Sequence, residues 1–162
     1  MINTKNLLEL IESNSKLTTS DIADSLGVSE LEVVNEISKL EKDKVICGYN
    51  AIINWDKVTE EKVNALIEVK VTPQRGMGYD RLAERIAKFD EVNSIYLISG
   101  SYDFMVIING KSMKEISSFV FEKISTIDMI QSITTHFVLK KYKDHGVLMN
   151  EKKVDHREII SI

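Results

Sequence analysis

The chain has few of the residues on which catalytic and metal sites depend. Its three histidines show no ligand spacing with one another or with the one cysteine, so there is no basis for a metal site. There is no glycine-rich phosphate loop and no nucleophile elbow. We therefore expect no cofactor and no enzyme activity. Cys47 lies in the apolar run 45–47, which predicts a buried structural thiol rather than a reactive one.

Long apolar segments are also missing. No apolar run approaches the length of a membrane span and no secretory signal opens the chain, so we expect a cytoplasmic protein without membrane contact. The 162 residues are 43% hydrophobic and 28% charged, a balance that favours folded domains over disorder. This length allows one medium domain or two small ones.

Residues 19–44 have the pattern of a helix-turn-helix. Ala23 allows a close helix crossing, Gly27 can take the left-handed conformation that ends a helix, and Val33 packs inward. Ser29 stands three residues before Glu32, the spacing of a capping box. Apolar residues recur at helical spacing and predict the buried face: Ile22, Leu26, Val33, Ile37 and Leu40. The alternative is an ordinary helical hairpin. An amphipathic segment from Asn6 to Ile11 predicts a first helix before this pair.

The charge of this part is unfavourable for DNA binding. The first 50 residues have five lysines, no arginine and nine carboxylates, a balance of −4 that accounts for the whole net charge. An acidic surface repels the phosphates whose neutralisation drives duplex binding. Either Lys39, Lys42 and Lys44 supply local phosphate contacts, or this domain has kept the shape and lost the binding.

The rest of the chain alternates between strand and helix patterns. Residues 49–55 predict a strand or an extended linker. Period-two alternation predicts a strand over 65–71, ended by Pro73 and followed by a turn at 76–78. An apolar stripe from Tyr79 to Phe89 predicts a helix. Strands are expected at 92–99, 103–109 and 130–141, with a helix capped by Ser112 between the last two.

This order predicts an α+β protein with a C-terminal ferredoxin-like βαββαβ domain, in which one face of a four-stranded antiparallel sheet is covered by two helices. We expect a helix-turn-helix domain at 1–48, an extended linker at 49–62, the ferredoxin-like domain at 63–145 and a tail at 146–162. The open sheet face mixes apolar and polar residues, which predicts contact with another copy.

The chain resembles the Lrp/AsnC (leucine-responsive/asparagine regulator) family of transcription regulators over nearly its whole length. The resemblance rests on Lys39-Leu40-Glu41 at the end of the helix-turn-helix and on Ile46-Cys47-Gly48-Tyr49 before the linker. It rests also on the segment Ser99-Gly100-Ser101-Tyr102-Asp103-Phe104, similar to the family's Gly-x-Tyr/Phe-Asp turn. It implies dimers formed by sheet-to-sheet pairing, assembled further into tetramers, octamers or hexadecamers, with an amino acid bound between dimers.

The resemblance also implies an effector site. It assigns effector contacts to Gly100, Tyr102, Asp103, Thr134 and Thr135, with the Asp103 carboxylate near the ammonium group of the amino acid. The alternative is that Asp103 only fixes the turn through local amide hydrogen bonds, and that both threonines are ordinary strand residues. His136 is a weaker candidate.

Two functions follow as hypotheses. The first is a DNA-binding transcription regulator of amino-acid metabolism genes, controlled by an amino-acid effector. Its partner is double-stranded DNA, and the candidate contacts are Thr19, Ser20, Ser29, Glu30, Asn35, Ser38, Lys39 and Lys42. The second is an oligomeric amino-acid sensor that no longer binds DNA and acts through a protein partner.

Overall fold

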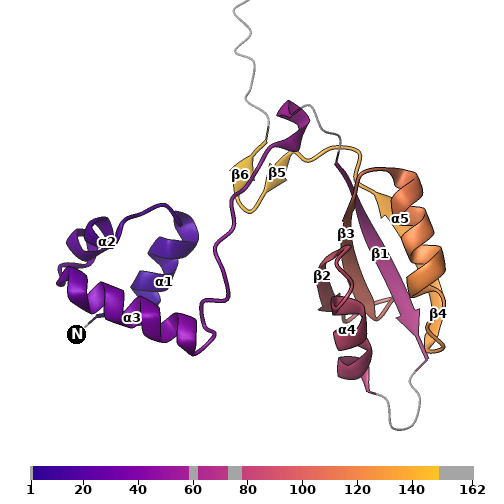
Figure 1. Ribbon diagram of the computed structural model, residues 1–162, viewed down its shortest axis with the longest axis horizontal. Helices are drawn as coiled ribbons and strands as arrows, with labels where there is room; N and C mark the ends of the chain where they lie inside the picture. Colours follow the sequence, from indigo (N-terminus) through magenta and orange to yellow (C-terminus); the bar gives the residue numbers. More distant parts are fainter. Residues whose placement is uncertain (1, 59–61, 73–77, 150–162) are drawn as a thin grey trace, which may run out of the picture. The chain divides into compact units, whose positions relative to one another are not determined.

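The computed structural model describes residues 2–58, 62–72 and 78–149. The chain divides into two compact units, Met1–Ile52 and Ile53–Ile162. Figure 1 shows helices alone in the first unit and a sheet with helices in the second. Within the described ranges, no helix has the length and apolar character needed to cross a membrane.

The first unit is the expected three-helix unit. Its helices are α1 (Thr4–Ser13), α2 (Thr19–Leu26) and α3 (Glu30–Lys42). Gly27 ends α2 with φ of 64°, in the left-handed region, as its position predicts. Capping boxes start both later helices, pairing Thr18 with Asp21 and Ser29 with Glu32. The buried core consists of Leu7, Ile22, Ala23, Val33 and Leu40.

The second unit has the ferredoxin-like fold. Its elements are β1 (Val63–Val71), α4 (Tyr79–Ala87), β2 (Val92–Leu97), β3 (Phe104–Gly110), α5 (Met113–Phe119) with a π-helical turn at Val120–Ile124, and β4 (Ile130–Phe137). The strands pair antiparallel in the order β2-β3-β1-β4. The predicted fold class is confirmed.

Alternation along the strands separates the two faces of this sheet. Ala65, Ile67, Val69 and Val71 of β1 are buried with Phe104, Val106 and Ile108 of β3, and the same core contains residues of α4 and α5. Both helices therefore cover one face. The strand residues that alternate with these buried ones, such as Leu66, Glu68 and Ile107, lie on the open face of the sheet.

The last strand is shorter than expected. β4 ends at Phe137, opposite Ala65, and one more hydrogen bond joins the Val138 amide to the Asn64 carbonyl at 2.8 Å. Its partner β1 begins at Val63, so beyond this point β4 has no strand to pair with. The chain instead forms a hairpin from β5 (Lys143–Asp144) and β6 (Val147–Leu148).

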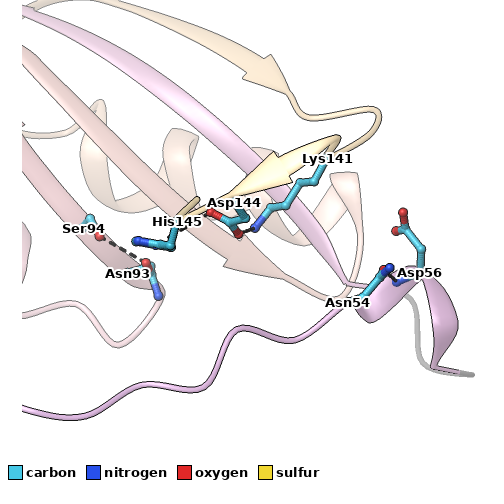
Figure 2. A network of polar contacts seen from close by, with 7 residues as sticks. All are labelled: Asn54, Asp56, Asn93, Ser94, Lys141, Asp144 and His145. Carbon is cyan, nitrogen blue, oxygen red and sulfur yellow. Dashed lines mark hydrogen bonds and ion pairs between the residues drawn. The ribbon is translucent and has the colours of Figure 1, made fainter. Parts of the chain in front are cut away.

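The hairpin is joined to the segment that precedes β1. Figure 2 shows Lys141 beside Asp144, with 3.0 Å between the ammonium nitrogen and a carboxylate oxygen. The Asn54 side-chain amide donates to the Met149 carbonyl, and a short 3-10 turn follows at Trp55–Lys57. Residues 47–54 form neither helix nor strand, so the alternative of a strand over 49–55 is not realised.

Cys47 contradicts its prediction because it is exposed. The amides of Val45 and Ile46 both donate to the Leu40 carbonyl, which holds the chain near the end of α3. Of the apolar run, only Ile46 packs against the core, while Cys47 turns outward and its thiol lies 3.1 Å from the Lys44 carbonyl. The predicted turn at 76–78 lies largely outside the described residues, as do Pro73 and most of the tail.

Candidate DNA-binding surface and effector site

The outward face of α3 has a central stripe without carboxylates. With 100° of rotation per residue, the positions opposite the buried Val33 and Leu40 are occupied by Leu31, Asn35, Ser38 and Lys42. All four side chains are exposed. The stripe offers an amide, a hydroxyl and an ammonium group, which are hydrogen-bonding groups suited to base edges and phosphates.

The four glutamates of α3 lie beside this stripe and each accepts a hydrogen bond within the first unit. Thr19 donates its hydroxyl to Glu30, and the Ser29 amide and hydroxyl donate to Glu32 at 3.2 and 3.0 Å. On the same helix, Glu36 accepts from the Thr4 hydroxyl at 2.8 Å, and Glu41 from the Tyr49 hydroxyl at 3.0 Å. The carboxylates hold neighbouring segments against α3.

These contacts divide the candidate DNA-binding residues into those whose side chains bond within the first unit and those whose side chains remain available. Thr19 and Glu30 bind each other, and the Ser29 side chain caps α3. By contrast, among the described residues no hydrogen bond or ion pair engages the side chains of Ser20, Asn35, Ser38 and Lys42. Lys39 is exposed and lies 4.0 Å from Glu36, whose side chain is only 17% exposed. The free groups are therefore those of the central stripe, together with Ser20 at the start of α2.

The cap of α3 is also an electrostatic feature. Hydrogen bonds from the Ser29 amide, and then from its hydroxyl, lower the pKa of Glu32 below its ordinary value of 4.5. In α2 the Thr18 hydroxyl, followed by the Thr18 amide, lowers the pKa of Asp21 below 3.8. Both carboxylates are thus held ionised at the helix starts, where the positive end of the helix dipole also favours negative charge.

The turn between β2 and β3 contains the first part of the candidate effector site. Asp103 accepts hydrogen bonds from the Val71 amide at 2.8 Å and from the Tyr79 hydroxyl at 3.3 Å, one on each carboxylate oxygen. Its own amide donates to the Val69 carbonyl at 3.0 Å. Asp103 therefore joins the turn to the end of β1 and the start of α4. Burial, followed by the negative charge of Asp103 and this hydrogen bond, raises the pKa of Tyr79.

The fold does not require a glycine at position 100. Gly100 is exposed and its φ is outside the left-handed region, and an added Cβ would meet only the Ile98 side chain, at an ordinary 3.7 Å. Tyr102 is half-buried. A glycine without a conformational reason leaves room for another molecule to approach its backbone.

The two candidate threonines of β4 lie on opposite faces of the sheet. Thr134 pairs with Glu68 on the open face, whereas Thr135 pairs with the buried Ile67 on the helix-covered side. Beside Thr134, the His136 ring nitrogen lies 3.2 Å from a Glu68 carboxylate oxygen. The structure therefore places Thr134 on the open face of the sheet and Thr135 on the helix-covered face.

A hollow of about 400 Å³ lies between α4 and the segment before β4, and the sequence analysis missed it. Its charged lining contains Arg81, Arg85 and Lys88, at spacings of four and three residues along α4 and its C-cap, together with the carboxylates of Glu84 and Asp128. The hollow and the β2–β3 turn both lie near the C-terminal end of β1. The Thr72 amide donates to the Met129 carbonyl in the lining of the hollow, and the neighbouring Val71 amide donates to Asp103 of the turn. In the sequence, the helical spacing of the three cations was the signal that could have indicated this hollow.

The chain combines a helix-turn-helix unit with a ferredoxin-like domain. This combination defines a class of proteins in which a DNA-binding fold is joined to a second domain that can bind a ligand. A family model described as the Lrp/AsnC ligand binding domain matches residues 64–148. The chain belongs to the Lrp/AsnC family of helix-turn-helix transcriptional regulators, which confirms the resemblance noted in the sequence.

Similar proteins agree with this assignment. The uncharacterized HTH-type transcriptional regulator YugG of Bacillus subtilis is 48% identical over 156 residues, covering 96% of this chain and 94% of its own length. The proline dehydrogenase transcriptional activator of Rhizobium radiobacter is 21% identical, covering 87% and 90%. The relatives and structural neighbours are regulators and not enzymes, as expected.

Solved structures share the fold. The transcriptional regulator NMB0573 of Neisseria meningitidis, in complex with L-Met, aligns with a TM-score of 0.67 at 22% identity, covering 85% of this chain and 88% of its own. AsnC of E. coli aligns with a TM-score of 0.64 at 22% identity, covering 87% and 94%.

Proposed function

We propose that this protein is a DNA-binding transcription regulator of amino-acid metabolism genes, controlled by an amino acid bound between dimers. One observation carries the DNA-binding part: the outward stripe of α3 has no carboxylate and ends in Lys42. The four glutamates of α3 thus flank the proposed groove-facing surface instead of occupying it. Thr19, Ser20, Ser29, Glu30 and Lys39 then support or border the contacts made by Asn35, Ser38 and Lys42.

The test is a gel-shift titration of the full chain against its own upstream DNA at low and moderate salt. We expect a specific complex whose affinity falls as salt rises, because lysine–phosphate contacts release counterions. Lys42→Ala is expected to weaken binding to all sequences and to lower the salt slope by about one. No specific complex at any salt would defeat this proposal and favour the alternative, an amino-acid sensor that acts through a protein partner.

The effector site is proposed at the β2–β3 turn, with contacts from Gly100, Tyr102 and Asp103. Of the two threonines predicted in β4, Thr134 on the open face joins this site, whereas Thr135 lies on the helix-covered face. Two observations support it: the glycine at position 100 that the fold does not require, and the structural neighbour solved with L-Met. Since both Asp103 oxygens already accept hydrogen bonds, Asp103 holds the turn in place as well as supplying negative charge.

Calorimetry with a panel of amino acids tests this site. Gly100→Ala should preserve the fold and lower the affinity at least tenfold, because the new methyl group occupies the space a ligand needs. Asp103→Ala should also weaken binding. Gly48→Ala is the matched control, since a Cβ there meets nothing within 4 Å. Unchanged affinity in both Gly100→Ala and Asp103→Ala would show that the β2–β3 turn has a structural role only and does not bind the amino acid.

A further inference from the structure

Two large apolar side chains are exposed on the face of α3 that the proposed function directs at DNA. Leu31 is 69% exposed and Val34 is 41% exposed. Neither belongs to the core of the first unit or packs against it. Leu31 shares the central stripe with Asn35, Ser38 and Lys42, and Val34 lies on its border. The fold therefore gives no reason for a leucine at this end of the stripe.

The chemistry of the major groove supplies a reason. The one apolar group on its base edges is the C5-methyl group of thymine, which apolar side chains contact, while an asparagine amide pairs with adenine through two hydrogen bonds. A stripe that presents leucine one helical turn before asparagine is thus matched to A·T pairs. Building on the proposed DNA binding, we infer that Leu31 and Val34 are specificity residues that recognise thymine methyl groups.

An apolar protein partner fits the same face less well. A helix that docks in a groove presents apolar anchors at spacings of three, four and seven residues along its length. On α3 the apolar character stops after Val34, and the following outward positions are Asn35, Ser38 and Lys42. A surface with methyl contacts at one end and polar groups along the rest matches base edges bordered by phosphates.

The experiment replaces thymine by deoxyuridine in the bound upstream fragment, which removes the methyl group and keeps the Watson–Crick pairing. The full-length protein should bind the deoxyuridine fragment about three- to tenfold more weakly than the thymine fragment. Leu31→Ala should weaken binding to the thymine fragment and lose part of the discrimination between the fragments, because Val34 still contacts methyl groups. Leu31→Met, which keeps an apolar side chain of similar volume, should retain the discrimination.

Val45→Ala is the matched control, because Val45 is an apolar residue of the same unit that is 55% exposed and lies outside α3. It should discriminate between the fragments as the parent does. Equal binding of both fragments by the parent protein would overturn the inference, and so would undiminished discrimination by Leu31→Ala. These results leave DNA binding intact, whereas the absence of any specific complex would defeat the proposed function and this inference together.

Discussion

At the scale of single residues, the position of a charge on α3 matters more for the proposed DNA contact than the number of charges in the unit. A carboxylate that accepts a hydrogen bond keeps its negative charge, so Glu30, Glu32 and Glu36 still repel phosphates at short range. Their hydrogen bonds hold them beside the stripe of Leu31 and Asn35 instead of on it. The bond from the Ser29 amide to Glu32 also stabilises the unit, because it satisfies an amide that the helix cannot pair.

The capping carboxylates predict how stability depends on pH. The folded-state pKa values of Asp21 and Glu32 lie below their ordinary values of 3.8 and 4.5, so their contribution is complete above those values. It is lost as the pH falls through the lower folded-state pKa values, since the unfolded chain binds protons first. Urea unfolding followed by circular dichroism from pH 6 to pH 3 should show this loss.

The double variant Asp21→Asn/Glu32→Gln should be less stable than the parent at pH 6 and should lose less stability on acidification. Glu12→Gln serves as the control, because Glu12 is an exposed residue of α1 with no hydrogen bond to the described residues. A parent and double variant with parallel pH profiles would contradict the linkage.

At the scale of elements, the sequence predicted what local chemistry determines. Gly27 and Ser29 set the end of α2 and the start of α3, and alternation in 65–71 set the buried face of β1, because each depends on neighbours along the chain. The predicted end of the last strand was wrong because it depends on where β1 begins. The predicted burial of Cys47 was wrong because an apolar run need not be buried throughout.

The candidate effector site shows the same limit. The sequence indicated Asp103 by its turn motif, but its partners Val71 and Tyr79 lie 32 and 24 residues away in the chain. Nor could a motif show that Thr134 and Thr135 face opposite sides of the sheet. Such contacts depend on strand register and helix placement, which are set by the packing of the whole domain.

The Gly27 turn gives a prediction at this scale. Its φ of 64° is unfavourable for a residue with a Cβ, so Gly27→Ala should lower the free energy of unfolding by about 1–2 kcal/mol. No atom lies within 4 Å of the added Cβ, so the backbone strain accounts for the whole effect. Gly48→Ala, whose φ is not left-handed, should cost less than half as much in the same urea titration. Equal losses would contradict this account of the turn.

At the scale of the whole molecule, we propose that the acidic first unit binds DNA with the help of further copies of the chain. Linking two weak binding units raises their joint affinity by about 10²–10⁴-fold when both can engage one DNA. The open sheet face provides a surface for such linkage, because Leu66, Met105 and Ile107 lie on it between polar residues and Tyr96 is 53% exposed. We propose that this face pairs two chains, and that the dimers assemble into a tetramer or octamer.

Ile107→Glu tests the assembly and the DNA binding together. A carboxylate in the middle of a paired sheet face loses its hydration without a partner, so light scattering should show a smaller native mass than that of the parent. DNA affinity should then fall about 10²-fold or more, although α3 itself is unchanged. Ser117→Glu introduces the same charge on the exposed side of α5 and should preserve both properties. If Ile107→Glu kept its native mass, the open face would not be the dimer interface; if the mass fell and DNA affinity did not, a single acidic unit would bind without linked copies.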